Sequence, residues 1–309
     1  MAPTQHIVKL HSGSREFSTL SNYSQEDIFV NENKKWTRIV FLIHGFPDIN
    51  SSFDASWDTI LNILPGTLLL APTLRGYEPS SQGNLKDYKL SQLADDVRSW
   101  ILEVSPAGTI PVHLVGHDWG AGVSFKTAHT YPDLLASIST LAFPYLTNIK
   151  PWEMLWYCPL QMYYSSYIFT MQFAFLYKKK LTDKSKNSYI NKLWKFWSPT
   201  WKFSEDDIEE VKETFQKPGV PDSATAYYRC MDLKELAWPV DFDKVPTLIL
   251  GGDSDGCMTK SVYELEARKL KNVPNVKVQL LSKLGHFLHR QDPVKVAEIF
   301  SDWILKHDV

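Results

Sequence analysis

The chain has 309 residues, of which 44% are hydrophobic and 22% are charged. This composition is ordinary for a globular enzyme and excludes disorder across the whole chain, while the length favours one core with an insertion. With 33 basic and 35 acidic residues the formal net charge is −2. A nucleic-acid partner is therefore not expected, and a small, near-neutral ligand fits better.

Buried strands and helical patterns alternate along the first part of the chain. Loose alternation over residues 6–24 predicts a β-hairpin, and continuous apolar runs predict strands that are buried on both faces. These strands are expected at Arg38–Ile43, Thr67–Leu70, Val112–Val115 and Ile138–Phe143. Helical spacing is found at Trp57–Leu64 and Leu90–Val104.

The alternation stops after Phe143 for about ninety residues. Residues 146–235 are helical in pattern and rich in tryptophan and tyrosine. Within them, Leu160–Tyr177 is mostly apolar and precedes three lysines, but its polar residues favour a buried helix over a membrane span. The remaining elements are a strand at Val245–Gly252, a helix at Ser261–Leu270, a strand at Val276–Leu281 and a closing helix at Val294–Leu305.

This order of elements predicts an α/β fold, with a mostly parallel, doubly wound sheet and ligands bound beyond the carboxyl ends of its strands. We expect residues 1–145 and 236–309 to form the core and residues 146–235 to form a helical cap. The insertion leaves from the carboxyl edge of the sheet. It should therefore cover the site as a lid whose aromatic residues exclude water.

The cysteines and the first residues of the chain indicate the cellular compartment. Cys158, Cys230 and Cys257 are widely spaced, without a CxxC motif or a histidine at metal-ligand spacing, which is typical of reduced thiols. The first residues show no signal-peptide pattern. We therefore expect a cytoplasmic protein without stable membrane insertion.

The segment Gly116-His117-Asp118-Trp119-Gly120 follows an apolar strand and opens a helix of small residues. A strand, a sharp turn and a helix, with glycines two positions either side of a central residue, form the nucleophile elbow of α/β-hydrolases. Asp118 occupies the central position. A carboxylate is anionic at neutral pH and can displace a leaving group from saturated carbon, which leaves an ester on the enzyme. The alternative is that Asp118 only caps the following helix.

Hydrolysis of such an ester needs a base, a group that orients the base, and donors for an oxyanion. His286 follows the strand Val276–Leu281, and Asp253 and Asp255 follow the preceding strand. The chain order of nucleophile, acid and histidine is the one that the α/β-hydrolase topology imposes. We therefore expect His286 to be the base, with either aspartate as its orienting acid.

Two backbone N–H groups are candidates for the oxyanion hole. The elbow supplies that of Trp119, and the loop after the first buried strand supplies that of Phe46. In this loop, His44-Gly45-Phe46-Pro47, the glycine lets the chain turn and the proline fixes it. A plain tight turn is the alternative, and we expect a structural role for His44.

Together, the motifs HGFP, RGY, GHDWGA and GHF resemble those of epoxide hydrolases in the α/β-hydrolase superfamily, over nearly the whole chain. The resemblance implies cofactor-free hydrolysis of a small lipophilic epoxide by water, through an ester on Asp118, to a vicinal diol. By the family's register, it also implies that Asp255 rather than Asp253 is the acid of the triad.

The resemblance further implies that two tyrosines of the lid hydrogen-bond the epoxide oxygen. One precedes an arginine in a YR dipeptide, which selects Tyr228. The other follows an aromatic residue in the first lid helix, which selects Tyr164, with Tyr157, Tyr163 and Tyr167 close by as alternatives. A phenol suits this task because it can donate to a developing alkoxide while it stays protonated at neutral pH.

Three rival functions share parts of this pattern. Haloalkane dehalogenases use the same Asp and His but typically place Asn, which helps to bind the halide, where this chain has Phe46. A non-catalytic ligand-binding protein on the same scaffold is a second rival, although the intact set of residues argues against it. An oxygenase of the luciferase type is a third. The physiological epoxide and the oligomeric state are not predicted.

Overall fold

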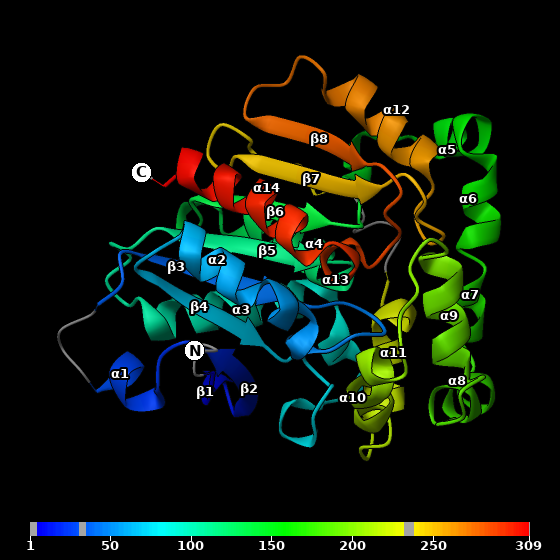
Figure 1. Cartoon of the computed structure of the whole chain (residues 1–309), viewed down its shortest axis with the longest axis horizontal. Coiled ribbons are helices and arrows are strands. Elements are labelled where there is room, and N and C mark those ends of the chain that lie inside the picture. Colours follow the sequence, from blue (N-terminus) through cyan, green and yellow to red (C-terminus); the bar gives the residue numbers. More distant parts are fainter. Residues whose placement is uncertain (1–4, 31–34, 232–237, 309) are drawn as a thin grey trace.

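An eight-stranded sheet forms the centre of the computed structural model, which describes residues 5–30, 35–231 and 238–308 (Figure 1). The strand order is β1-β2-β4-β3-β5-β6-β7-β8. The hairpin of β1 and β2 and its contact with β4 are antiparallel, and the pairs from β4 to β8 are parallel. The strands are β1 (His6–Ser12), β2 (Arg15–Ser21), β3 (Arg38–Ile43), β4 (Thr67–Pro72), β5 (Val112–His117), β6 (Ser137–Leu141), β7 (Thr247–Gly252) and β8 (Val276–Leu281).

Helices cover both faces of the sheet, which explains why its central strands are continuous apolar runs. Val40 and Leu42 of β3 pack with α2 and α14 in one cluster, whereas Ile39 and Phe41 pack with α3 and α4 in another. The helices of the core are α1 (Gln25–Phe29), α2 (Trp57–Ile63), α3 (Leu90–Val104), α4 (Trp119–Thr130), α12 (Lys260–Leu270), α13 (Leu288–Gln291) and α14 (Pro293–Lys306). This arrangement confirms the predicted α/β fold.

The chain between β6 and β7 contains helices and no strand in its described part. These helices lie beyond the carboxyl ends of the parallel strands (Figure 1). They are α5 (Pro151–Tyr157), α6 (Pro159–Tyr164), α7 (Tyr167–Thr170), α8 (Ala174–Leu181), α9 (Tyr189–Trp197), α10 (Asp206–Thr214) and α11 (Val220–Arg229). The limits of 145 and 235 for a separate cap stay a prediction, and the second falls outside the described residues.

One expectation for this region is wrong. Leu160–Tyr177 does not form a single buried helix but contributes to three short helices, α6, α7 and α8. Breaks occur at Ser165–Ser166 and at Met171–Phe173, and within the stretch only Gln161, Met171 and Tyr177 are buried. The apolar pattern arises instead from side chains that face outward. Among the described residues, no helix is long and apolar enough to cross a membrane.

Candidate active site

Asp118 lies between β5 and α4 with φ 50° and ψ −115°, a backbone conformation that a non-glycine residue adopts only when its surroundings enforce it. The glycines of the elbow make room for this turn, since a Cβ atom at Gly120 would collide with the carbonyl oxygen of Ile43. The side chain of Asp118 makes no capping hydrogen bond to α4. Its Oδ1 instead accepts a hydrogen bond of 2.7 Å from the backbone N–H of Phe46. The carboxylate thus projects from the elbow rather than serving as a helix cap.

His286 lies between two carboxylates. Its Nδ1 is 3.1 Å from Asp255 Oδ2, and its Nε2 is 3.5 Å from Asp118 Oδ2. The other oxygen of Asp255 accepts hydrogen bonds from the backbone N–H groups of Cys257 and Met258, which fix its orientation. Asp253, by contrast, accepts from the backbone of Lys283 and stays in the turn. The structure therefore places Asp255, and not Asp253, beside His286.

The two carboxylates determine the charge of His286. Burial disfavours the imidazolium, but the negative charge of Asp255 and the hydrogen bonds to Asp118 and Asp255 outweigh it and raise the pKa of His286 to about 10. At neutral pH this histidine is therefore protonated as long as Asp118 carries no ester. Loss of the charge on Asp118 would remove one of the two stabilising partners and lower this pKa.

A cavity of about 170 Å³ lies in front of Asp118, between the elbow and the cap. Tyr228 of α11 lines it with a buried hydroxyl that has no hydrogen-bond partner among the described residues. Burial, with a smaller contribution from the charge of Asp118, raises the pKa of Tyr228 well above its usual value, so the phenol stays protonated. Tyr227 also lines the cavity, but its hydroxyl donates to the carbonyl oxygen of Arg75. Of these two neighbours, Tyr228 keeps a proton available for a ligand.

Tyr167 of α7 is the second cap tyrosine in this cavity. Its ring centroid lies 5.7 Å from that of Tyr228, and its hydroxyl is 3.7 Å from Cys257 Sγ. Burial raises its pKa well above the usual value as well. The structure thus brings together Tyr167 and Tyr228 with Asp118.

Tyr164 lies elsewhere, contrary to the position expected for it. It is the last residue of α6 and lines a separate cavity of about 940 Å³, where its ring packs 5.4 Å from that of Phe196. Tyr163 and Tyr157 are largely exposed. The motif selects Tyr164 because this tyrosine follows another aromatic residue. However, α6 ends at Tyr164, and α7 begins with Tyr167, which lines the cavity in front of Asp118. No signal in the sequence marks this break strongly.

The two residues expected to supply oxyanion donors, Phe46 and Trp119, both lie next to Asp118. Phe46 donates its N–H to Asp118, and its ring packs 5.4 Å from Tyr228 and 5.8 Å from Phe215 of the cap. Trp119 is the first residue of α4, where backbone N–H groups have no partner within the helix. His44 accepts from the N–H of Leu74 and joins two loops of the core, as its expected structural role requires.

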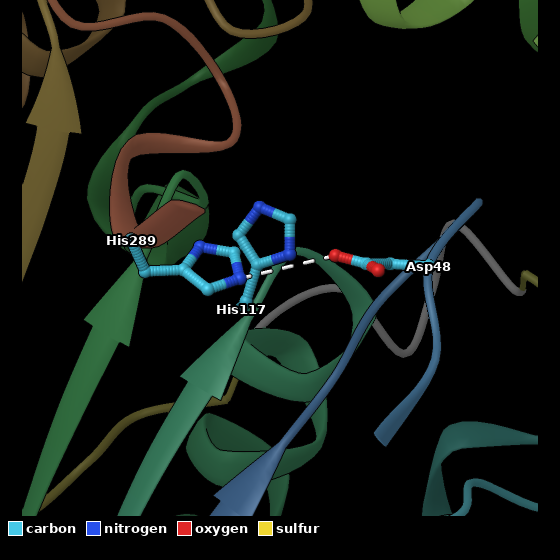
Figure 2. A group of neighbouring side chains, drawn as sticks. All are labelled: Asp48, His117 and His289. Atoms are coloured by element: carbon cyan, nitrogen blue, oxygen red, sulfur yellow. Dashed lines mark ion pairs between the residues drawn. The ribbon is translucent and has the colours of Figure 1, made fainter. Parts of the chain in front are cut away.

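Sequence reasoning missed a buried polar cluster behind the triad, formed by Asp48, His117 and His289 (Figure 2). His117 Nε2 donates a 3.0 Å hydrogen bond to the carbonyl oxygen of His286, and its Nδ1 has no partner among the described residues. Burial and then the charge of His286 lower the pKa of His117 to about 4, so its ring is neutral. The cluster thus holds the backbone of His286. The motif GHD and the aspartate directly after HGFP were the available signals.

Two groups have the geometry to gather around a cation, namely this cluster and the set of Asp118, Cys257 and His286. In the first, the guanidinium of Arg290 already contacts Asp48 at 3.0 Å and balances its charge. In the second, a protonated His286 repels a cation. We therefore interpret both groups as hydrogen-bonding or proton-transferring groups and not as cation sites.

Comparisons with known proteins agree with this geometry. The sequence profile of the alpha/beta hydrolase fold family matches residues 38–293. The AB hydrolase superfamily protein YfhM of Bacillus subtilis is 23% identical over 269 residues, which cover 86% of this chain and 90% of that protein. Epoxide hydrolase 4 of Mus musculus is 24% identical over 275 residues, or 86% and 72% of the two chains.

Among solved structures, an epoxide hydrolase of Bacillus megaterium in complex with an inhibitor superimposes with a TM-score of 0.74 at 18% identity, covering 96% of this chain and 100% of that one. An epoxide hydrolase of Vigna radiata superimposes with a TM-score of 0.67 at 21% identity, covering 98% of each chain. The resemblance first drawn from short motifs thus extends over nearly the whole chain. With its profile match, its strand order and its elbow, the chain belongs to the alpha/beta hydrolase fold family.

Proposed function

We propose that this protein hydrolyses small lipophilic epoxides to vicinal diols. One observation carries the proposal: the carboxylate of Asp118 shares a cavity with two phenols of the cap, Tyr167 and Tyr228. A nucleophile on one side and two proton donors on the other suit a reaction in which a carbon–oxygen bond breaks and the oxygen stays on the product. The similarity to proteins named epoxide hydrolases supports the same reaction.

In the first step, an oxygen of Asp118 attacks the less hindered carbon of the epoxide, and the bond between that carbon and the ring oxygen breaks. The ring oxygen takes a proton from one of the two cap tyrosines that line the cavity, Tyr167 or Tyr228. The product is a hydroxyalkyl ester. The ester is neutral, so the pKa of His286 falls and its proton is released. The tyrosinate takes up a proton in exchange, so the phenol is restored before the second step.

In the second step, His286 acts as a base, oriented by Asp255. It removes a proton from water, and the hydroxide attacks the carbonyl carbon of the Asp118 ester. The N–H groups of Phe46 and Trp119 stabilise the oxyanion. The bond to the diol oxygen breaks, and this oxygen takes the proton from His286. The Asp118 carboxylic acid that results holds one oxygen from water, and it passes its proton to His286, which restores the carboxylate and the imidazolium.

Single turnover in ¹⁸O-labelled water tests this sequence directly. With styrene oxide and excess enzyme, we expect the label in Asp118, read by mass spectrometry of the peptide that contains it, because the first oxygen given to the diol comes from the enzyme. His286→Gln should accumulate a protein heavier by the mass of styrene oxide. Label found first in the diol, with none in Asp118, would rule out the ester.

The dehalogenase rival is tested on the same preparation. Phe46 presents only a packed aromatic side chain where a halide donor would be needed, and two phenols have no task in halide release. We therefore expect diol from styrene oxide and no halide from a panel of haloalkanes. Halide release without diol would replace the proposal, and tight binding of lipophilic molecules without turnover would favour the non-catalytic alternative.

A further inference from the structure

The outer side of the cap exposes a dense group of large apolar side chains. Within the described residues, 17 large hydrophobic side chains are exposed, and ten of them come from residues 152–175. We call these ten, with the neighbouring Phe196, the outer cap surface. They are Trp152, Leu155, Trp156, Tyr157, Leu160, Met162, Tyr163, Phe169, Phe173 and Phe175.

Figure 1 shows where this surface lies: α5, α6, α7 and α8 form the edge of the molecule farthest from the sheet. The exposure is high, at 78% for Trp156, 75% for Phe175 and 67% for Phe169. Exposed apolar residues scattered singly are normal in soluble proteins, but a concentration of this kind marks a surface that binds something.

The same segment concentrates positive charge. Residues 146–203 contain nine lysines and two acidic residues, a net charge of +7 in a chain whose formal net charge is −2. Lysines adjoin the apolar groups. Lys178, Lys179 and Lys180 follow Phe175 in α8, and Lys178 pairs with Asp222 at 2.9 Å, which leaves Lys179 and Lys180 for a partner. Lys192 and Lys195 line the cavity of about 940 Å³ with Phe196 and Leu160, and Asp253, Asp255 and Glu264 line it as well. The partner of this surface should therefore be both apolar and anionic.

We propose that the outer cap surface docks on the surface of a bilayer that contains anionic phospholipid. Exposed tryptophan and tyrosine side chains suit the boundary between headgroups and acyl chains, leucine and phenylalanine can enter the acyl region, and lysine ammonium groups reach anionic headgroups. The short helices α5 to α8 can lie on a membrane but not cross it, which agrees with the lack of a spanning helix in the described chain. Docking of this kind is peripheral and reversible.

Charge also decides between a bilayer and a second copy of this chain. A symmetric dimer through this surface would bring together two segments that each carry a net charge of +7, and like charges in an interface disfavour association. Anionic lipid instead neutralises the lysines at the same time as the apolar side chains leave water.

The docking surface adjoins the catalytic cavity through α7. Tyr167 and Ile168 line the cavity in front of Asp118, and the next residue, Phe169, belongs to the outer cap surface. A lipophilic molecule dissolved in the bilayer would therefore meet the protein close to the wall of its cavity. Given the proposed function, this contact assigns the substrate class as epoxides that partition into membranes, such as long-chain alkyl epoxides.

Co-sedimentation with vesicles tests the docking independently of catalysis. We expect the protein to bind vesicles of phosphatidylcholine with phosphatidylserine, to bind pure phosphatidylcholine at least about tenfold more weakly, and to dissociate as salt rises. The double variant Trp156→Ser and Phe175→Ser, and the double variant Lys179→Glu and Lys180→Glu, should each lose about tenfold or more of the binding. Both should keep the circular dichroism spectrum and the activity on dissolved styrene oxide.

A matched control replaces two equally exposed apolar residues outside the surface. Ile7 and Val30 are each 71% exposed, and the double variant Ile7→Ser and Val30→Ser should bind vesicles like the unmodified protein. Equal loss in the control, or equal binding to neutral and anionic vesicles, would overturn the proposal. So would a dimer in analytical ultracentrifugation that the Trp156→Ser and Phe175→Ser variant abolishes.

The substrate class needs a separate comparison. With a long-chain epoxide carried in anionic vesicles, we expect the unmodified protein to turn over at least about tenfold faster than the surface variants, while styrene oxide in solution gives equal rates. No diol from either substrate would refute the proposed function and leave the vesicle binding as the test of docking. Equal rates on the vesicle-borne epoxide would refute the membrane delivery alone.

Discussion

The two sides of the cap use similar side chains in opposite surroundings. On the inner side, Tyr167 and Tyr228 are packed against Phe46, Trp119 and Trp197, and burial holds their protons firmly. On the outer side, Trp156 and Tyr163 are largely exposed to water, at 78% and 66%. The role that we propose for an aromatic residue of the cap therefore depends on its surroundings: a buried tyrosine donates a proton, and an exposed aromatic side chain contacts a membrane.

The same contrast applies to charge. The charges of Asp118, Asp255 and His286 are buried and compensate one another within the site. The lysines of residues 146–203, which adjoin the outer cap surface, have few acidic neighbours in sequence. The buried groups should control the rate of the chemical steps. The exposed groups should affect only where the enzyme acts, and variants of each kind can separate the two contributions.

Removal of the nucleophile should have the largest effect. Asp118→Ala leaves neither an ester-forming oxygen nor the second partner of His286, so we expect styrene oxide turnover to fall by at least about 10⁴-fold in a steady-state diol assay. Asp253→Ala is the matched control, because this carboxylate stays in its turn, and it should change kcat by less than about threefold. Full activity in the Asp118 variant would disprove the mechanism.

The cap tyrosines should come next. Tyr228→Phe and Tyr167→Phe each remove one proton donor, so we expect the rate constant for ester formation to fall by about 10²-fold for each variant, measured by single-turnover fluorescence quenching. Tyr164→Phe changes a side chain in the separate outer cavity and should stay within about twofold of the unmodified enzyme. A large loss in Tyr164→Phe, with none in Tyr167→Phe, would show that Tyr164 is the second proton donor, as the sequence motif indicated.

A smaller effect is expected from His117, which acts on His286 only through its backbone. His117→Leu removes one hydrogen bond to the His286 carbonyl, worth about 1 kcal/mol, so kcat for ester hydrolysis should fall about fivefold. The variant His117→Gln can still donate a hydrogen bond to that carbonyl and should recover most of the rate. Equal losses in the Leu and Gln variants would show that the volume of the ring, rather than its hydrogen bond, is what matters.

The core was predictable from the sequence because its constraints are local. The apolar runs Arg38–Ile43 and Val276–Leu281 recur as strands with the predicted bounds, and the helix at Leu90–Val104 does the same. The elbow needs glycine on both sides of Asp118, which leaves a clear signal. The positions of Asp255 and His286 follow from strand order, since the carboxyl ends of parallel strands share one edge.

The cap was less predictable because packing between short helices decides it. An apolar run such as Leu160–Tyr177 has the same pattern whether its side chains face a core or the surface. Tyr164 and Tyr167 are three positions apart, about one helical turn, and only the break after α6 determines which of them reaches the cavity. The cluster of Asp48, His117 and His289 was missed because its members are far apart in the chain.

The last prediction concerns pH and separates the buried charges from the rest of the fold. The pKa of His286 is about 10 in the folded protein and 6.5 in its ordinary state, so the folded protein binds more protons between these values. The stability from this histidine is complete below pH 6.5 and is lost as pH rises toward 10. The lowered pKa values of His44 and His117, about 4, affect stability only below pH 6.5, so they do not mask the effect.

We therefore expect the midpoint of thermal unfolding to fall by several degrees more between pH 7 and pH 9.5 in the unmodified protein than in His286→Gln, measured by circular dichroism. The surface variant Trp156→Ser and Phe175→Ser should follow the unmodified protein, because its substitutions lie outside the triad. If His286→Gln lost as much stability over this range, the histidine would not be held in its charged form by Asp118 and Asp255. The first step would then need another source for the released proton.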